Sequence, residues 1–125
     1  RFALANLFLE MDKYPEAIEI YDLLNEAAPL WSCPWRHKGE ALYKSGNFES
    51  AKIALGKAIE TNEEHYDAYI WYAKTLYELK EYKQALTALE TAFNLTEENE
   101  ESEFDMVLSE EELNQLYQEL QKLAK

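Results

Sequence analysis

Cysteine and histidine are the residues of this chain best suited to covalent or metal chemistry, and there are few of them. Cys33 and His37 lie four residues apart, so on a helix they would share one face, as a thiolate–imidazole pair requires. The other histidine, His65, is 28 residues beyond His37, and there is no second cysteine. A catalytic or zinc site needs further bases or ligands nearby. We therefore predict no catalytic, cofactor-binding or metal site, and a chain that is not an enzyme.

Carboxylates are abundant, and many of them gather in one segment. Residues 97–105 read EENEESEFD, and no Lys or Arg occurs between Lys83 and Lys122. The segment lacks the alternating Asp or Asn ligands and the glycine of a calcium loop. We expect residues 98–108 to form a solvated acidic connector, with a docking arm for a basic partner as the alternative.

The composition favours a helical protein with an acidic surface. The 125 residues include only three glycines and three prolines, and 47% are hydrophobic, which is enough for one continuous core. A formal charge of −13 would repel nucleic acid and anionic membranes, so we expect a protein or peptide partner that is basic or neutral. No apolar run is long enough to cross a bilayer, and the single cysteine weakly favours a reducing compartment. A soluble, cytoplasmic protein is the expectation.

An internal repeat organises the chain. Ala17, Ala51 and Ala85 are 34 residues apart, and the residues around them recur in the same register. Three positions before each alanine the chain has an aromatic residue: Tyr14, Phe48 and Tyr82. Twelve positions before, it has a small residue: Ala5, Gly39 and Ala73. A period of this length is typical of stacked helical repeats, in which no copy buries its apolar face alone.

Each copy contains two segments with apolar residues at helical spacing, separated by a short polar turn. We place the copies at residues 1–30, 31–64 and 65–97; the first begins part-way through its first helix, as expected for a fragment of a longer protein. The expected helices cover residues 2–11, 15–28, 32–45, 48–60, 64–79 and 82–95. Ser32 is expected to cap its helix, and Lys38 to lay its stem on the core with its ammonium in water.

These positions resemble the tetratricopeptide repeat, whose 34-residue pattern is Trp, Leu, Gly, Tyr, then Ala, Phe or Tyr, Ala and Pro. The middle copy has Trp35, Lys38, Gly39, Leu42, Phe48, Ala51, Leu55 and Ala58. The third has Tyr69, Tyr72, Ala73, Leu76, Tyr82, Ala85, Leu89 and Ala92, and the first has Leu4, Ala5, Phe8, Tyr14, Ala17, Tyr21, Leu24 and Pro29. The resemblance extends over residues 1 to about 95. It implies one all-α domain over residues 1–125, a right-handed superhelix (solenoid) of antiparallel helix pairs.

The last segment predicts one more helix, over residues 109–125. Ser109 and Glu112 form a Ser-x-x-Glu capping box. Apolar residues then recur at steps of three and four: Leu113, Leu116, Tyr117, Leu120 and Leu123. Because a solenoid needs an end with a polar outer face, we expect this helix to cover the third copy. Dimerisation or partner docking through it is the alternative.

In tetratricopeptide proteins the first helices of successive copies line a concave groove, where extended peptides or partner helices lie. Transferred to this chain, the resemblance predicts these contacts: Asn6, Leu9, Arg36, Glu40, Tyr43, Lys44, Ile70, Trp71, Lys74 and Tyr77. Ile70 and Trp71 give their helix more apolar surface than internal packing needs, so we expect Trp71, with Tyr43 and Tyr77, to anchor a ligand. The alternative is that Trp71 packs against the connector or the terminal helix. A short basic strip for acidic ligand side chains is formed by Arg36, Lys44 and Lys74.

One subfamily of these proteins grips the C-terminal carboxylate of heat-shock chaperones with Lys, Asn and Arg side chains. Of those positions only Asn6 keeps its residue type here; the others are Phe2, His37, Asp67 and Trp71, so we expect no carboxylate clamp. The prediction is a non-catalytic protein-interaction scaffold that binds a peptide segment or partner helix in the groove. The alternatives are a self-association module, forming a homodimer through the terminal helix or the exposed repeat ends, and an accessory domain that positions a substrate for a larger enzyme.

Overall fold

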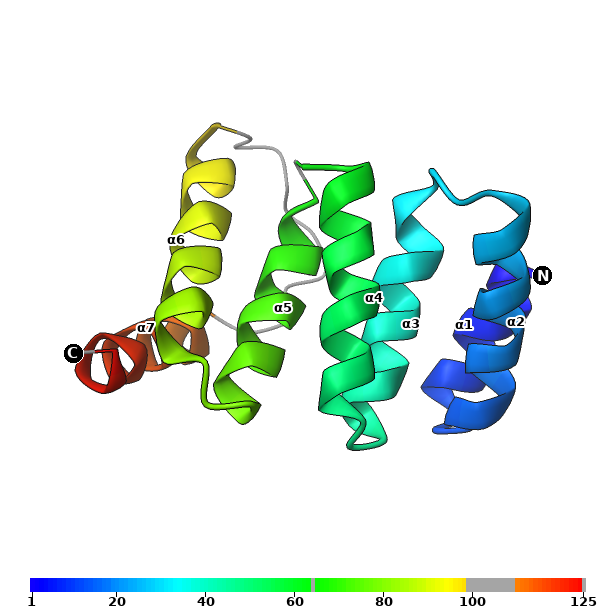
Figure 1. Ribbon diagram of the computed structural model, residues 1–125, viewed down its shortest axis with the longest axis horizontal. Helices are drawn as coiled ribbons and strands as arrows, with labels where there is room; N and C mark the ends of the chain where they lie inside the picture. The colour runs from blue at the N-terminus through cyan, green and yellow to red at the C-terminus, as the bar shows by residue number, and fades with distance from the viewer. Residues whose placement is uncertain (64, 99–109, 125) are drawn as a thin grey trace.

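Antiparallel helix pairs, stacked in chain order, make up this protein. In the computed structural model, the described residues are 1–63, 65–98 and 110–124. Within these ranges the chain forms seven helices and no strand: α1 (Phe2–Glu10), α2 (Tyr14–Ala27), α3 (Ser32–Lys44), α4 (Phe48–Thr61), α5 (Tyr66–Glu78), α6 (Tyr82–Glu98) and α7 (Glu110–Leu123). Figure 1 shows the three helix pairs following one another along the molecule, with α7 running crosswise behind the lower part of α6. The predicted all-α fold is confirmed.

The helix bounds agree with the predicted ones to within three residues. Glu64, Ser109 and most of the predicted acidic connector lie outside the described residues, and Glu98 belongs to α6. The prediction for Ser32 is wrong. Ser32 is the first residue of α3 and Trp31 occupies the cap position, because the Ser32 hydroxyl hydrogen-bonds with Nδ1 of His65 at 3.1 Å instead of capping the helix.

Small and large residues interlock at matched positions of the three copies. No exposed surface remains at five small residues: Ala5, Ala17, Ala51, Ala73 and Ala85. The large side chains at one equivalent position of the second helices are also fully buried: Tyr21, Leu55 and Leu89. Gly39 is buried against Leu55, so α3 and α4 approach closely at this point. The 34-residue register therefore determines the core.

Lys38 shows how the pattern accommodates a charged residue at a usually apolar position. Its ammonium pairs with Asp22 of α2 at 2.6 Å and lies 5.5 Å from the centroid of the Trp35 ring. The ammonium therefore ends at a carboxylate of the preceding copy, a partner that the sequence did not predict.

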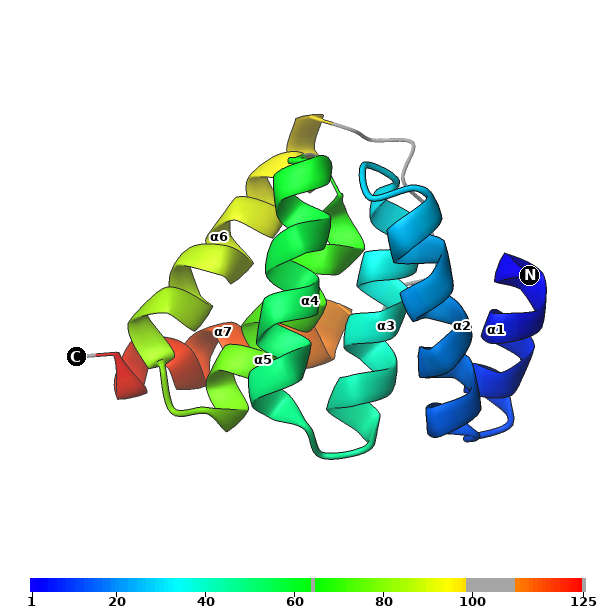
Figure 2. The same ribbon diagram turned by 45° about the vertical axis from the view of Figure 1, so that its right-hand side comes forward.

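Helix α7 covers the third copy. Leu113 and Leu120 are buried in one cluster with Ile70 and Ala73 of α5. Figure 2 shows α7 running crosswise to the repeat helices, with its first turns close to α5. The predicted capping is confirmed, although Leu123, the last residue of the predicted apolar face, stays 42% exposed.

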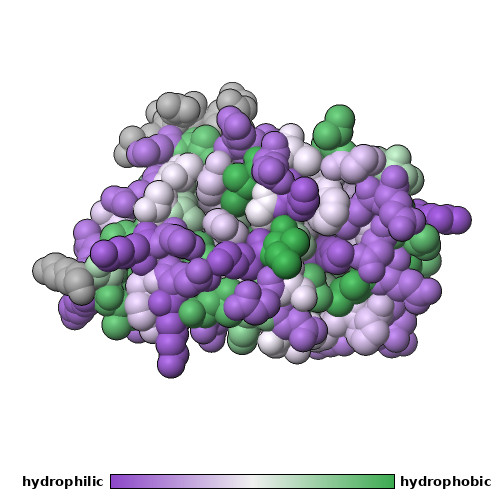
Figure 3. All heavy atoms as spheres, viewed as in Figure 1, coloured by the Kyte–Doolittle hydropathy of each residue, from purple (hydrophilic) through white to green (hydrophobic). Residues whose placement is uncertain are grey.

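The face on which α2, α4 and α6 are prominent is mainly hydrophilic. Figure 3 shows its apolar residues as separate small areas among polar and charged ones. Of the helices that the structure describes, none combines the length and the apolar character needed to cross a membrane.

The turn inside each copy uses one residue with positive φ. Asp12, Gly46 and Lys80 occupy this position, with φ of 61°, 86° and 65°. In the middle copy the N–H of Asn47 donates to the carbonyl of Leu42 at 2.8 Å, as in a Schellman motif, and the other two copies repeat this bond. The three copies therefore make the same turn with different residues.

Lys80→Gly should stabilise the protein, because lysine is strained in a left-handed conformation that glycine adopts freely. Allowing for the greater unfolded-state entropy of glycine, we expect the free energy of unfolding to rise by about 0.5–1 kcal/mol. The reciprocal change, Gly46→Lys, should lower it by a similar amount. Urea denaturation measures both, and a loss of stability in Lys80→Gly would contradict the prediction.

Candidate functional site

Three helices carry all ten predicted contact residues. These are α1, α3 and α5, the first helices of the three copies, and α3 packs against both of the others. The residues are thus on adjoining helices, as the tetratricopeptide pattern requires. They differ in how much surface they leave for a ligand.

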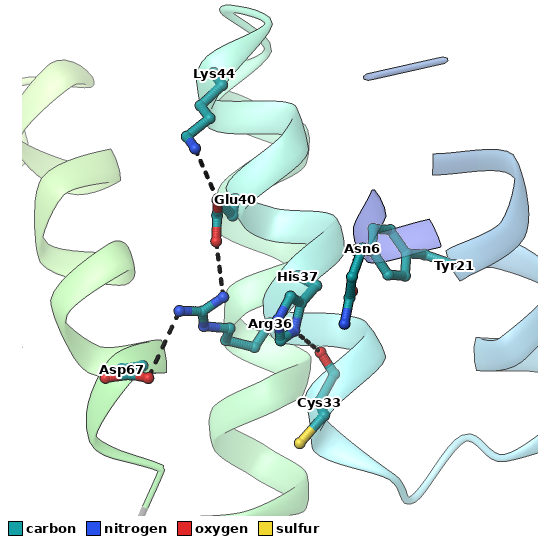
Figure 4. A network of polar contacts seen from close by, with 8 residues as sticks. All are labelled: Asn6, Tyr21, Cys33, Arg36, His37, Glu40, Lys44 and Asp67. Atoms are coloured by element: carbon teal, nitrogen blue, oxygen red, sulfur yellow. Dashed lines mark hydrogen bonds and ion pairs between the residues drawn. The ribbon is translucent and has the colours of Figure 1, made fainter. Parts of the chain in front are cut away.

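A line of alternating charges runs along α3. Nη1 of Arg36 lies 2.7 Å from Glu40, and the ammonium of Lys44 lies 2.9 Å from the other oxygen of the same carboxylate. Nη2 of Arg36 also approaches Asp67 of α5 at 3.6 Å, so Arg36 joins the second and third copies (Figure 4). Arg36 is only 8% exposed, and two of the three cations of the predicted basic strip, Arg36 and Lys44, are paired with carboxylates.

Trp71 is covered by side chains of α3 and by Lys74 of its own helix. The ring of Tyr43 packs edge-to-face on it, with centroids 5.4 Å apart. Arg36, Lys44 and Lys74 approach the indole at 5.9, 5.9 and 4.2 Å from its centroid. Trp71 is 6% exposed, and its N–H has no hydrogen-bond partner among the described residues. The prediction of uncovered aromatic surface at Trp71 is therefore wrong, because cations and a tyrosine cover the ring.

Lys74 lies between two aromatic rings. Its ammonium is 4.2 Å from the Trp71 centroid and 5.0 Å from the Tyr43 centroid. Burial lowers the pKa of Lys74, and the nearby Lys44 adds to the effect, whereas Glu112 of α7 is among the carboxylates that oppose it. The rings thus hold a cation that has lost much of its water.

A cleft of about 280 Å³ opens beside these rings, where α3, α5 and α7 meet. Eight of the described residues line it: Tyr43, Lys74, Tyr77, Glu78, Glu112, Gln115, Leu116 and Glu119. The Tyr77 hydroxyl donates a 2.5 Å hydrogen bond to Glu119, and this bond, more than burial, raises the pKa of Tyr77 to about 12. The cleft therefore combines tyrosine rings, an apolar wall and several carboxylates.

The first-copy end of the groove is filled by its own side chains. Phe2 packs on Trp31 and His37, with ring centroids 4.8 and 5.1 Å away. Asn6 accepts a 2.5 Å hydrogen bond from the hydroxyl of Tyr21. Leu9 is 5% exposed. This part of the groove offers a ligand less surface than the part near α7.

Cys33 and His37 share a face of α3, as their spacing predicts. Nδ1 of His37 hydrogen-bonds with the main-chain carbonyl of Cys33 at 2.9 Å, and not with the thiol. Burial, and then the charge of Arg36, lowers the pKa of His37. The same causes lower the pKa of His65 to about 4. Both rings are thus held in the neutral form as parts of the packed interior.

The structure brings most of the predicted contacts together and separates the rest. Seven lie around Trp71 and the cleft: Arg36, Glu40, Tyr43, Lys44, Trp71, Lys74 and Tyr77. Leu9 and Ile70 are core residues, since they are 5% and 1% exposed. The lining residues outside the ten predicted contacts are Glu78 of α5 and four residues of α7: Glu112, Gln115, Leu116 and Glu119. The helical spacing of apolar residues around Leu116 predicted the helix, but the spacing does not indicate in which direction α7 crosses the first helices of the repeats.

The stacked helix pairs, with a cleft where α3, α5 and α7 meet, define a helical repeat scaffold of the kind that binds other proteins. A sequence model of the tetratricopeptide repeat matches residues 40–109, more than half of the chain. The chain therefore belongs to the tetratricopeptide repeat family, whose members are typically non-enzymatic interaction scaffolds. Comparison with curated proteins gives no significant match.

Solved structures of this family superimpose well. The TPR2B domain of yeast Sti1, in its complex with pHsp70, is 26% identical; the alignment covers 94% of this chain and 90% of that one, with a TM-score of 0.83. The first TPR of Spaghetti (RPAP3), bound to the HSP90 peptide SRMEEVD, is 21% identical over 98% and 90% of the two chains, with a TM-score of 0.82. The Yersinia enterocolitica chaperone SycD, with a peptide of the translocator YopD, is 15% identical over 99% and 92%, with a TM-score of 0.87. The last two likenesses concern the fold alone.

Proposed function

We propose that this domain binds a segment of a partner protein along α3 and α5, with the cleft at α7 as the main anchor. The observation that carries the proposal is the cleft itself, in which Tyr43 and Tyr77, from equivalent positions of adjacent copies, meet Leu116 of α7. Tyrosine rings beside an apolar wall are common anchors in protein interfaces. The complex of the similar Sti1 domain with pHsp70 supports a protein partner. A cytoplasmic location stays a prediction from the sequence.

The ligand should differ from a chaperone C-terminus. Three positions of the carboxylate clamp hold Phe2, His37 and Trp71, and all three side chains are packed against neighbouring rings. A fourth holds Asp67, whose carboxylate lies near Arg36. These residues supply no free cation where the clamp would need one, so recognition is proposed to use internal residues of the bound segment.

The test is a selection of random phage-displayed peptides against the domain, followed by titration of the best binders with variants. Tyr43→Ala should weaken binding at least about 10-fold, because truncating a central aromatic anchor is costly. Ile53→Ala, which removes a 67% exposed side chain on α4, outside the cleft, serves as the control and should leave affinity within about twofold. Binders that lose affinity in Ile53→Ala and keep it in Tyr43→Ala would overturn the proposal.

Self-association is a second candidate, favoured by one surface. Leu4, Leu7 and Met11 of the α1 end are 47%, 50% and 51% exposed and recur at steps of three and four. A second copy could cover this stripe, whereas α7 already uses its buried leucines to cover the third copy. Static light scattering distinguishes the two candidates, since a constant monomer mass at all concentrations would contradict self-association.

A further inference from the structure

The carboxylates of the cleft come from two helices. Glu78 belongs to α5, and Glu112 and Glu119 belong to α7, one turn before and one turn after Leu116. Glu112 and Glu119 are both exposed to solvent. Among the described residues that line the cleft, Lys74 is the only cation. The cleft therefore has a net negative charge on the side formed by α7.

Lys74 offsets only part of the charge of the three carboxylates, although Glu112 and Glu78 both act on its ammonium. The ammonium lies over Trp71 and Tyr43, on the side of the cleft that faces α3, at 4.2 and 5.0 Å from the ring centroids. Lys44 and Arg36 approach the same indole. The cations thus gather around Trp71, whereas Glu119 of α7 is bonded to Tyr77 at the other side of the cleft.

Aromatic rings beside the cleft already bind positively charged side chains of this protein. Three positively charged side chains lie against the indole of Trp71, and one of them also contacts Tyr43. Tyr77 presents a similar ring at the α7 side, fixed edge-to-face by Tyr82 at 5.9 Å and by the hydrogen bond to Glu119. A ring fixed beside carboxylates suits a second cation, with Leu116 available to its aliphatic stem.

From these contacts we infer that the α7 side of the cleft receives a basic side chain, arginine or lysine, of the bound segment. The inference rests on the proposed function and specifies the chemistry of the partner. Arginine suits the cleft well, because its planar guanidinium can stack on Tyr77 while its N–H groups reach Glu112 or Glu119. The net charge of −13 would attract such a segment from a distance, and an acidic segment would meet three carboxylates.

Peptides from the phage selection test the inference. Those whose binding depends on Tyr43 should share an arginine or lysine at one position. A synthetic copy with citrulline, which keeps the shape of arginine and removes its charge, should bind about 10-fold more weakly. Glu112→Gln and Glu119→Gln should each weaken the arginine peptide several-fold and leave the citrulline peptide almost unchanged.

Glu111→Gln is the matched control, because it removes the same charge from α7 at an exposed residue that does not line the cleft. It should leave both affinities within about twofold. Equal affinity of the arginine and citrulline peptides, or Tyr43-dependent binders without a shared basic residue, would overturn the inference and leave the proposed function intact. If no selected peptide depends on Tyr43, the proposed function falls, and the inference falls with it.

Discussion

Gly39→Ala should lower the free energy of unfolding, and the same substitution at Gly56 should raise it. A Cβ atom at Gly39 would lie 2.5 Å from Cδ2 of Leu55, closer than unbonded carbon atoms can stay, and Leu55 is fully buried. Either Leu55 or α3 would have to move. Overpacking of this kind typically costs about 1–3 kcal/mol, and the better helix propensity of alanine offsets up to about 1 kcal/mol. We expect a net loss of about 1–2 kcal/mol.

Gly56 is the matched control because it is also inside a helix, and a Cβ there would meet no atom within 4 Å. Gly56→Ala should therefore add about 0.5–1 kcal/mol through helix propensity alone. Urea titrations followed by circular dichroism measure both variants. If Gly39→Ala is as stable as Gly56→Ala, then α3 and α4 are not as tightly packed as described.

Asn25→Leu should make the protein more stable by about 1–2 kcal/mol. Asn25 is 6% exposed, and neither its amide nitrogen nor its amide oxygen has a hydrogen-bond partner in the described part of the chain. A buried polar group without a partner costs about 1–3 kcal/mol, and leucine has a similar branched shape without the polar atoms. The equivalent residues of the other copies, Ile59 and Phe93, are apolar, so the fold does not require an amide at this position.

Thermal and urea denaturation would measure this gain. Asn94→Leu on α6 makes the same chemical change at an exposed position and should alter the free energy of unfolding by no more than about 0.5 kcal/mol. A destabilised Asn25→Leu would mean that the amide contributes to folding after all.

The sequence was sufficient to predict the repeats because their packing is local. Each helix contacts its neighbours along the chain, so a residue's place in the 34-residue register also gives its place in the core. This is why the three alanines of the repeat, Ala17, Ala51 and Ala85, are all fully buried. Ser32 was mistaken because its actual partner, His65, lies 33 residues away, at the start of the next copy.

The candidate site was predicted less well, because it depends on contacts that the repeat does not specify. The register identified Tyr43 and Tyr77 as equivalent residues on the groove face. It did not show that cations would cover Trp71, since the side chains that do so come mainly from the preceding copy. It also gave no position for α7, which lies outside the 34-residue pattern and supplies half of the residues that line the cleft.

One face of helix α7 has two roles. Its leucines hold it on the third copy, and Leu116, between them in sequence, forms a wall of the cleft. A segment that binds against this wall would bind only the state in which α7 is docked. Occupancy and docking are then thermodynamically linked, so the bound segment would stabilise α7, and each loss of docking energy would reduce affinity. The docking of α7 at the end of the solenoid would thereby help to determine which segments the domain binds.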